Sequence, residues 1–306
     1  MDLITTRALH DSGLTRHEIA RRVRTGTIIR LKRGHYLPKA ELTSLERHLL
    51  MVDTMPTATL ALESAALVHG LPVESIPERV QTIVAGTGRT RQRERRTVLT
   101  GRLADADTTW VEGVRVTTPE RTVVDITRLR GLDEGLVPWE AARWRARVEE
   151  RLEEFDAAIA DALGRLEKCR GVALGRRGLQ RASAWSQSPM ETRSRLIMAR
   201  GEVPTPVQQF PVHNGRGVLL GVSDFAWPDL GLLGEYDGLD KYEYLARPGE
   251  SPLDVMRREK ARQEAMEAEG YLFVRWGKEE VVRPVRLLAR LRQAFETARR
   301  RPFRGR

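Results

Sequence analysis

Cysteine is almost absent from this sequence. The 306 residues include one cysteine, Cys169, so no internal disulfide bond can form, which fits a reducing compartment. Without a histidine motif nearby, Cys169 is more typical of a structural residue than of a nucleophile. No cluster of cysteine and histidine residues indicates a zinc site.

Long hydrophobic runs are also missing. No uncharged apolar stretch approaches the length that crosses a membrane. The first residues lack the charged region and apolar run of a signal peptide, and we found no internal repeat. The sequence therefore predicts a cytoplasmic protein with no membrane partner.

Negative charge is in deficit. Lys and Arg number 52 against 42 Asp and Glu, a formal net charge of +10, while apolar residues make up 41% and support packed cores. A basic excess favours polyanionic partners, and double-stranded DNA is the partner we expect. The alternative is an arginine-rich protein whose charges are simply solvated. A chain of this length has room for two or three domains.

Residues 1–41 are predicted to form a winged helix-turn-helix. A short helix over Thr5–His10 precedes a capping-box pattern, in which Thr15 caps a second helix and Glu18 reaches back to its start. Residues 27–31 and 35–38 are typical of two strands around a basic turn. A set of basic residues on the second helix and the hairpin is expected to contact DNA: Arg16, Arg21, Arg22, Arg24, Arg30, Lys32 and Arg33.

Residues 42–187 are predicted to form a mixed α/β middle region. The expected elements are helices over Leu45–Met51, Thr59–His69 and Trp139–Lys168, strands over Val80–Ala85, Thr97–Leu99 and Val114–Val116, and a helix that Thr118 caps and Pro119 begins. His69 is interpreted as a helix-end residue and not as a metal ligand. The basic stretch 88–96 is either a loop that grips a phosphate backbone or a solvated loop.

Residues 188–306 are predicted to form the last domain, in the order helix, three strands, helix, strand, helix. Ser188 and Pro189 mark the first helix start. The expected elements that follow are strands over 207–212, 218–227 and 232–237, a helix from Ser251 to Gly270, a strand over Tyr271–Trp276 and a helix over Val281–Arg300.

Four carboxylates occupy element ends in this last domain. Glu191 opens a helix, Asp224 ends an apolar strand, and Glu235 and Asp237 lie on the next strand. Carboxylates at the ends of buried strands are costly unless a cation pairs with them, and magnesium prefers carboxylate and water oxygens. We therefore expect Asp224, Glu235 and Asp237 to bind Mg²⁺ or Mn²⁺. The structural alternatives are a capping box for Glu191, a turn for Asp237, and a buried ion-pair network for the whole set.

The front of the chain resembles AbiEi antitoxins. Residues 1–41 resemble their N-terminal winged helix through Leu14-Thr15-Arg16-His17-Glu18-Ile19 and Arg30-Leu31-Lys32-Arg33-Gly34-His35-Tyr36. Two middle segments, 62–70 and 118–125, are similar to AbiEi-type actinobacterial proteins. The resemblance implies a regulator from an abortive-infection toxin–antitoxin system, with a cognate toxin protein as a candidate partner.

Residues 188–306 resemble the Vsr-like branch of the PD-(D/E)XK nuclease superfamily. The carrying residues are Glu191, Asp224, Glu235-Tyr236-Asp237-Gly238, Lys241-Tyr242, Glu259-Lys260-Ala261-Arg262 and Gly270-Tyr271-Leu272-Phe273-Val274-Arg275-Trp276. The resemblance implies a restriction-endonuclease-like α/β fold, with Asp224 and Glu235 as metal ligands. Glu191 would hold a metal-bound water or a second ion, and Lys241 would orient the attacking water.

One departure affects the catalytic lysine. The superfamily's third element is Glu-x-Lys on one strand, whereas this chain has Glu235-Tyr236-Asp237. Lys241 or Lys260 would have to supply the charge from a neighbouring position.

Two functions remain open for this multidomain α+β chain. The first is a metal-dependent DNA endonuclease that acts in phage defence or DNA repair. The second is a non-enzymatic AbiEi-like antitoxin and transcriptional repressor, whose nuclease-like domain is a scaffold or a toxin-binding module. RNA is a weaker candidate for the substrate.

Overall fold

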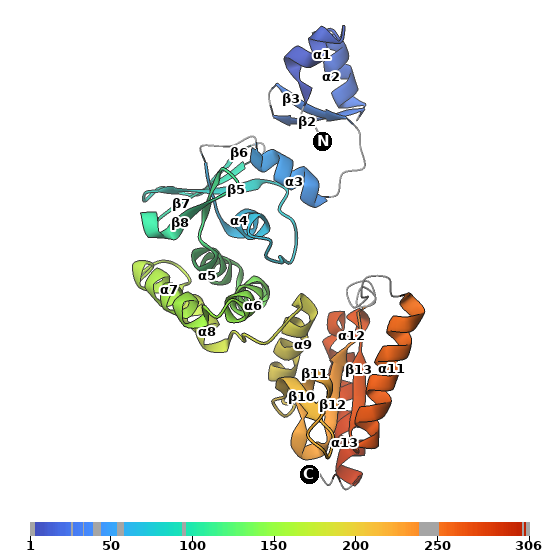
Figure 1. Cartoon of the computed structure of the whole chain (residues 1–306). Coiled ribbons are helices and arrows are strands. Elements are labelled where there is room, and N and C mark those ends of the chain that lie inside the picture. Colours follow the sequence, from blue (N-terminus) through green and yellow to red (C-terminus); the bar gives the residue numbers. More distant parts are fainter. Residues whose placement is uncertain are drawn as a thin grey trace. The chain divides into compact units, whose positions relative to one another are not determined.

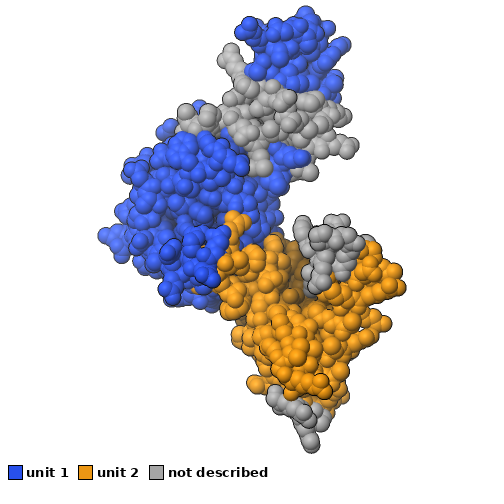
Figure 2. Space-filling view, in the orientation of Figure 1, with its two compact units in different colours: residues 1–142, 149–182 blue, residues 143–148, 183–306 orange. Residues whose placement is uncertain are grey.

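The chain forms two compact units. The computed structural model describes residues 4–25, 27–32, 34–38, 44–53, 58–93, 96–238, 251–301 and 303. Unit 1 holds residues 1–142 and 149–182, and unit 2 holds residues 143–148 and 183–306 (Figure 1; Figure 2). The three-part division expected from the sequence, with borders after residues 41 and 187, stays a prediction.

The N-terminal module consists of two short helices and a three-stranded antiparallel sheet (Figure 1). Its elements are β1 (Ile4–Thr5), α1 (Thr6–Asp11), α2 (Arg16–Arg24), β2 (Ile28–Lys32) and β3 (His35–Pro38), with β3 between β1 and β2. The predicted capping box is present, because Glu18 N donates to Thr15 Oγ1 (3.3 Å) and Thr15 N donates to Glu18 Oε2 (2.8 Å). The core is built from Leu9, Ile19, Ile28 and Tyr36. The expected two helices and hairpin are confirmed as elements.

The rest of unit 1 contains a six-stranded mixed sheet and helices. The elements are α3 (Ser44–Asp53), β4 (Thr59–Leu60), α4 (Leu62–Val68), β5 (Val80–Ala85), β6 (Arg91–Arg93), β7 (Arg96–Gly101), β8 (Thr108–Val111), β9 (Val114–Thr117), α5 (Pro119–Arg130), α6 (Leu132–Val148), α7 (Leu152–Arg165) and α8 (Val172–Arg181). The strand order is β6-β7-β5-β4-β9-β8. Strands β5 and β7 pair in parallel, as do β4 and β9. Strand β8 and helix α8 had no counterpart in the sequence prediction.

The helix predicted over Thr59–His69 was wrong at its start. Thr59–Leu60 form β4, which pairs with β5 on one side and with β9 on the other. The backbone at Ala61 is extended, and the helix begins only at Leu62. Leu60 is fully buried, so its place in the sheet outweighs its helix propensity.

Two further predictions in unit 1 need correction. The long helix expected over Trp139–Lys168 is interrupted, because Glu150 has a left-handed backbone (φ 58°) that a helix cannot contain. Helix α6 therefore ends at Val148, and α7 starts at Leu152. Within the basic stretch 88–96, residues Arg91–Arg93 form the edge strand β6 instead of a loop.

Unit 2 contains a four-stranded sheet in the order β10-β11-β12-β13. Its elements are α9 (Pro189–Arg200), β10 (Val207–His213), β11 (Leu219–Trp227), β12 (Leu232–Tyr236), α11 (Pro252–Ala268), β13 (Leu272–Trp276), α12 (Lys278–Val282) and α13 (Pro284–Arg300). Strands β10, β11 and β12 are antiparallel, and β13 runs parallel to β12. This order confirms the predicted order, but the final helix is split, since Pro284 disfavours helical geometry at Arg283 (φ −117°).

Helices cover both faces of this sheet (Figure 1). On one face, Phe225, Val274 and Trp276 pack against Leu287 and Leu291 of α13. On the other face, α11 contributes Met266 to a second cluster with Val212, Ala226 and Leu233. The result is three layers, with α9, α12 and α13 on one side and α11 on the other.

Residues 143–148, at the end of helix α6, belong to unit 2. The Arg147 guanidinium carbon lies 3.5 Å from the ring centroid of Trp185. This cation–π contact joins the end of α6 to the segment that leads into α9.

Candidate functional site

Glu235 is the most buried of the predicted metal ligands. It lies on β12 between β11 and β13 and is 1% exposed. Arg262 Nη2 donates to Glu235 Oε1 (2.7 Å), and Arg275 Nη2 lies 2.6 Å from Glu235 Oε2. One guanidinium comes from α11 and the other from the neighbouring strand β13, so both carboxylate oxygens already have a cationic partner.

Arg262 is held in place by a second carboxylate. Its Nη2 also donates to Glu259 Oε2 (2.9 Å), one turn earlier on α11. Burial lowers the pKa of Arg262, but the charges of Glu235 and then Glu259, with their hydrogen bonds, outweigh it and raise that pKa above the ordinary value. The arginine therefore stays charged, and it stands where the sequence predicted a divalent cation.

Asp224 lies on β11 and Glu235 lies on the neighbouring strand β12. Strands β11 and β12 pair antiparallel with Phe225 opposite Gly234. Asp224 and Glu235 are the next residues on the two strands, one position beyond this last pair. Tyr236 N donates to Asp224 Oδ2 (2.9 Å), which fixes the aspartate to the next strand.

Glu191 is held at the start of helix α9 by several hydrogen bonds. It is 7% exposed, and its own N donates to Ser188 Oγ (3.2 Å) at the start of α9. Its Oε2 accepts from Gln187 N (2.9 Å) and from Gln209 Nε2 (3.1 Å). Ser188 therefore caps α9, and the Glu191 carboxylate bonds to Gln187 N, one residue before the cap, so the capping box expected for Glu191 stays a prediction.

Of the remaining predicted residues, Asp237 lies near Glu235 and Lys260 does not. Asp237 Oδ2 lies 3.5 Å from Arg275 Nη1, in the same network as Glu235. Lys260 is exposed and lies 3.7 Å from Glu264, so it does not join the set. Lys241 lies outside the described residues.

A divalent metal does not fit the arrangement as it stands. Within the part of the chain that the structure describes, no group of three or more histidine, cysteine, aspartate or glutamate side chains is arranged to hold a metal ion. Both Glu235 oxygens contact arginine, and one Asp224 oxygen accepts a backbone hydrogen bond. The prediction of Mg²⁺ or Mn²⁺ therefore gains no support from this geometry.

The two arginines were missed at the sequence level. Arg275 interrupts the apolar strand Leu272–Trp276 and is the register partner of Glu235. An arginine at that place in a buried strand was a signal that a carboxylate lies beside it. Arg262 comes from a helix 27 residues later in the chain than Glu235, so its contact depends on the crossover and not on local spacing.

The second candidate site is helix α2. Arg16, Arg21, Arg22 and Arg24 are all exposed. No carboxylate of a described residue lies within ion-pair distance of these four. Their charges are therefore available to an external polyanion.

The helix start and the wing complete this surface. The pKa of Glu18 lies below its ordinary value, because Thr15 donates to it from its backbone and then its hydroxyl. On the hairpin, Arg30 is exposed. The side chain of Lys32 and the whole of Arg33 lie outside the described parts.

The quoted middle segments have structural roles. Arg121 is fully buried and donates to Asp107 (2.7 Å), to Asp125 (2.9 Å) and to Arg102 O (2.8 Å). His69 ends helix α4 as predicted, and its Nε2 lies 2.7 Å from Thr117 O. Segments 62–70 and 118–125 thus tie the helices of unit 1 to its sheet.

These observations define a class of protein: a basic helix–turn–helix and hairpin module, followed by an α/β region and a three-layer unit whose central carboxylate is neutralised. Residues 1–39 match the family model described as "Transcriptional regulator, AbiEi antitoxin". Residues 57–184 match the model described as "AbiEi antitoxin C-terminal domain". Both matches are to AbiEi antitoxin models, and neither extends into residues 188–306.

Curated relatives extend over nearly the whole chain. Uncharacterized proteins from two strains of Mycobacterium tuberculosis are each 29% identical to it over 289 residues. The similarity covers 94% of this chain and 99% of each relative. None of the described helices is both long and apolar enough to cross a bilayer.

Proposed function

We propose that this protein is a DNA-binding transcriptional regulator of the AbiEi antitoxin type that acts without catalysis. The observation that carries the proposal is the set of exposed arginines on α2, which form no ion pair with a carboxylate of the described residues. This helix lies inside the segment that matches the regulator model. The family description also favours a cognate toxin as the partner whose action is counteracted.

In this proposal the N-terminal module binds duplex DNA as a winged helix. Helix α2 enters the major groove, with Arg21, Arg22 and Arg24 directed at phosphates and base edges. The β2–β3 hairpin acts as the wing, and Arg30 contacts the backbone beside it. The net charge of +10 supports this orientation toward a polyanion.

Unit 2 is proposed to be a scaffold or a toxin-binding module. Support comes from Glu235, whose two oxygens are held by Arg262 and Arg275. A buried carboxylate with two guanidinium partners is a structural ion-pair network, the alternative recognised for this acidic set.

DNA binding is tested with a labelled duplex that spans the region upstream of the protein's own gene. We expect the Arg21→Ala/Arg22→Ala variant to bind about tenfold or more weakly, and its salt slope to fall by about 1 for each phosphate that the variant no longer neutralises. The matched control is Arg176→Ala/Arg177→Ala, which removes two exposed arginines from α8. Equal losses of affinity in both variants would reduce the effect to net charge and contradict the proposed recognition helix.

The endonuclease stays a second candidate, because Asp224 and Glu235 lie on the adjacent strands β11 and β12. It requires both arginines to leave Glu235 so that a metal can enter. A plasmid-nicking assay with Mg²⁺ or Mn²⁺ compares the wild type with Asp224→Ala. Metal-dependent nicking that disappears in the variant would favour the enzyme and defeat the non-catalytic proposal, whereas an uncut plasmid is the expected result.

A further inference from the structure

Strand β13 is the last strand of the sheet in unit 2. Among the described residues, its only strand neighbour is β12. Leu272 N donates to Gly231 O (2.8 Å), and Trp276 O accepts from Asp237 N (2.8 Å). The backbone groups of the even-numbered residues of β13 therefore point toward β12. In a parallel ladder alternate residues bond to alternate sides, so the backbone N–H and C=O groups of Phe273 and Arg275 face away from β12. This edge can accept another strand.

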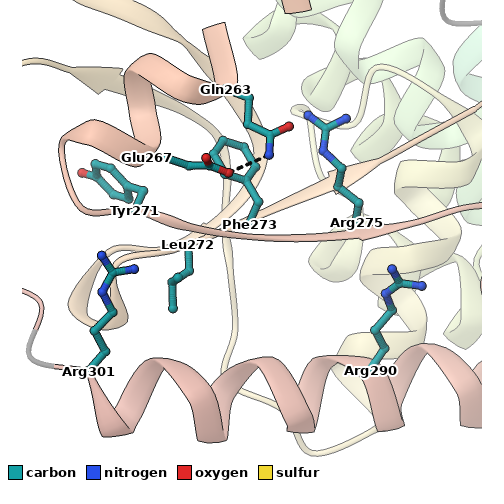
Figure 3. A pocket seen from close by; sticks show the side chains of 8 residues that line it. All are labelled: Gln263, Glu267, Tyr271, Leu272, Phe273, Arg275, Arg290 and Arg301. Atoms are coloured by element: carbon teal, nitrogen blue, oxygen red, sulfur yellow. Dashed lines mark hydrogen bonds between the residues drawn. The ribbon is translucent and has the colours of Figure 1, made fainter. Parts of the chain in front are cut away.

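A groove follows this edge between α11 and α13 (Figure 3). A cavity of ≈ 610 Å³ is lined by Gln263 and Glu267 of α11, by residues of β13, and by Arg290 and Arg301. A second hollow of ≈ 230 Å³ continues it along Leu272–Arg275 toward Gln293 and Thr297 of α13.

The groove has the length of a short extended segment. Arg290 and Arg301 lie eleven positions apart at the α13 side, which at about 1.5 Å per helical residue is roughly 16 Å. An extended chain rises about 3.3 Å per residue, so roughly five residues fit between the two arginines. Strand β13 itself has 5 residues.

The charge of the groove is positive on one side. Arg301 is exposed, and no carboxylate of the described residues pairs with it. The Arg290 side chain is 51% exposed although it pairs with Glu280 (2.8 Å). On the α11 side, Gln263 Nε2 donates to Glu267 Oε1 (2.6 Å), so this carboxylate is engaged locally.

Side chains on the two faces of β13 pack against different helices. Phe273 packs with the cluster on the α11 side, and Leu272 packs with the cluster on the α13 side. An added strand would place alternate side chains toward each helix. Acidic side chains at every second position would meet Arg290 and Arg301. A second copy of β13 would bring arginines against arginines, so self-pairing is disfavoured.

We propose that the edge of β13 binds an extended acidic segment of a partner protein by strand addition, with its carboxylates directed at Arg290 and Arg301. Backbone hydrogen bonds to Phe273 and Arg275 would supply the pairing, and the arginines would select the acidic side chains. This inference rests on the proposed partner-binding role of unit 2 and identifies the surface that performs it.

The test uses the full chain and a labelled, end-capped peptide of about seven residues that alternates glutamate and threonine, a length set by the groove and the strand rise. We expect saturable binding in fluorescence anisotropy. Arg290→Ala/Arg301→Ala should weaken it about tenfold or more. The control Arg292→Ala/Arg299→Ala removes two exposed arginines from the same helix, neither of which lines the groove, and should change it by less than about threefold.

Two modified probes separate strand addition from charge attraction. A peptide with N-methylated amides on one edge cannot complete the ladder and should not bind, and neither should a peptide with lysine in place of glutamate. Equal binding of the N-methylated and unmodified peptides would overturn the inference. So would a short single-stranded oligonucleotide that binds in an Arg290- and Arg301-dependent way while the acidic peptide does not.

Binding of the upstream duplex is measured in parallel on the same variants. Retained DNA binding shows that the N-terminal module is intact, and an unchanged urea-unfolding curve shows that unit 2 of Arg290→Ala/Arg301→Ala is folded. A peptide that fails on a chain that still binds the duplex contradicts this inference alone and leaves the DNA-binding proposal standing.

Discussion

Arg275 lies directly beside Glu235 in the parallel ladder of β12 and β13, and its Nη2 atom lies 2.6 Å from Glu235 Oε2. Arg262 Nη2 contacts the other carboxylate oxygen, Glu235 Oε1. The geometry gives the buried carboxylate the cation that it requires, but this cation belongs to the chain itself. These contacts favour a structural role for Glu235 in unit 2 over a catalytic role.

Removal of the Glu235 carboxylate should destabilise unit 2. Glu235→Ala leaves Arg262 and Arg275 without their shared partner in a largely buried place, which costs about 3–5 kcal/mol in comparable buried pairs. Urea unfolding checks this value. The control Glu264→Ala breaks only the exposed contact with Lys260 and should cost less than about 1 kcal/mol. A similar small loss for both variants would show that the network is not structural.

The packing of α8 on Trp139 should tolerate no added methyl group. A Cβ at Gly178 would come within 2.6 Å of the fully buried Trp139 ring. Gly178→Ala should therefore destabilise the fold by about 1–3 kcal/mol through overpacking.

Gly164 provides the matched comparison, because a Cβ there meets nothing within 4 Å in helix α7. Gly164→Ala should be neutral or should stabilise by up to about 1 kcal/mol. Thermal unfolding of the two variants measures the difference, and equal melting temperatures would contradict the prediction.

Stability should fall below neutral pH because of His48. Burial lowers the pKa of His48 below its ordinary value of 6.5, and the hydrogen bond with Pro77 O only partly opposes this. As pH falls through about 6.5 the unfolded chain gains a proton that the folded chain does not, so the free energy of unfolding decreases from there down to the lower folded-state pKa.

The measurement compares urea unfolding of the wild type and His48→Gln between about pH 5.5 and about pH 8. The wild type should lose more stability toward acid than the variant, and the two should run parallel above neutral pH. Identical acid slopes would show that His48 does not carry the effect.

Arg121 should be the most sensitive arginine of unit 1. Its side chain is fully buried and contacts Asp107, Asp125 and a backbone carbonyl. Arg121→Met keeps the volume but leaves two buried carboxylates short of a partner, so we expect a loss of about 3 kcal/mol in urea unfolding.

Arg115→Met is the control for Arg121, since Arg115 lies 3.6 Å from the exposed Asp105. Its loss should stay below about 1 kcal/mol. If Arg121→Met were equally mild, the remaining partners Arg165 and Arg128 would suffice for the two aspartates.

Local signals in the sequence predicted much of the fold. The capping box of Thr15 and Glu18, the cap at Ser188 and the hairpin turn at Asn214 each depend on neighbouring residues, and each is present. The order of elements in unit 2 followed from the same kind of signal.

What failed depended on distant contacts. Thr59–Leu60 join a sheet whose partners lie more than twenty residues away, and the break at Glu150 has no proline or glycine to announce it. In the acidic set, Asp224 and Glu235 lie on the adjacent strands β11 and β12. The partners of Glu235 come from 27 and 40 residues further along the chain, and periodicity gives no information about such pairs.

The end of helix α6 has a practical consequence for dividing the molecule. Arg147 stacks on Trp185 and belongs to unit 2. A fragment that begins at Ser183 would therefore lack the arginine that covers the Trp185 indole. Such a fragment, used in partner-binding studies, would expose an aromatic surface that favours non-specific association. The intact chain is therefore the sound starting material for assigning roles to either half.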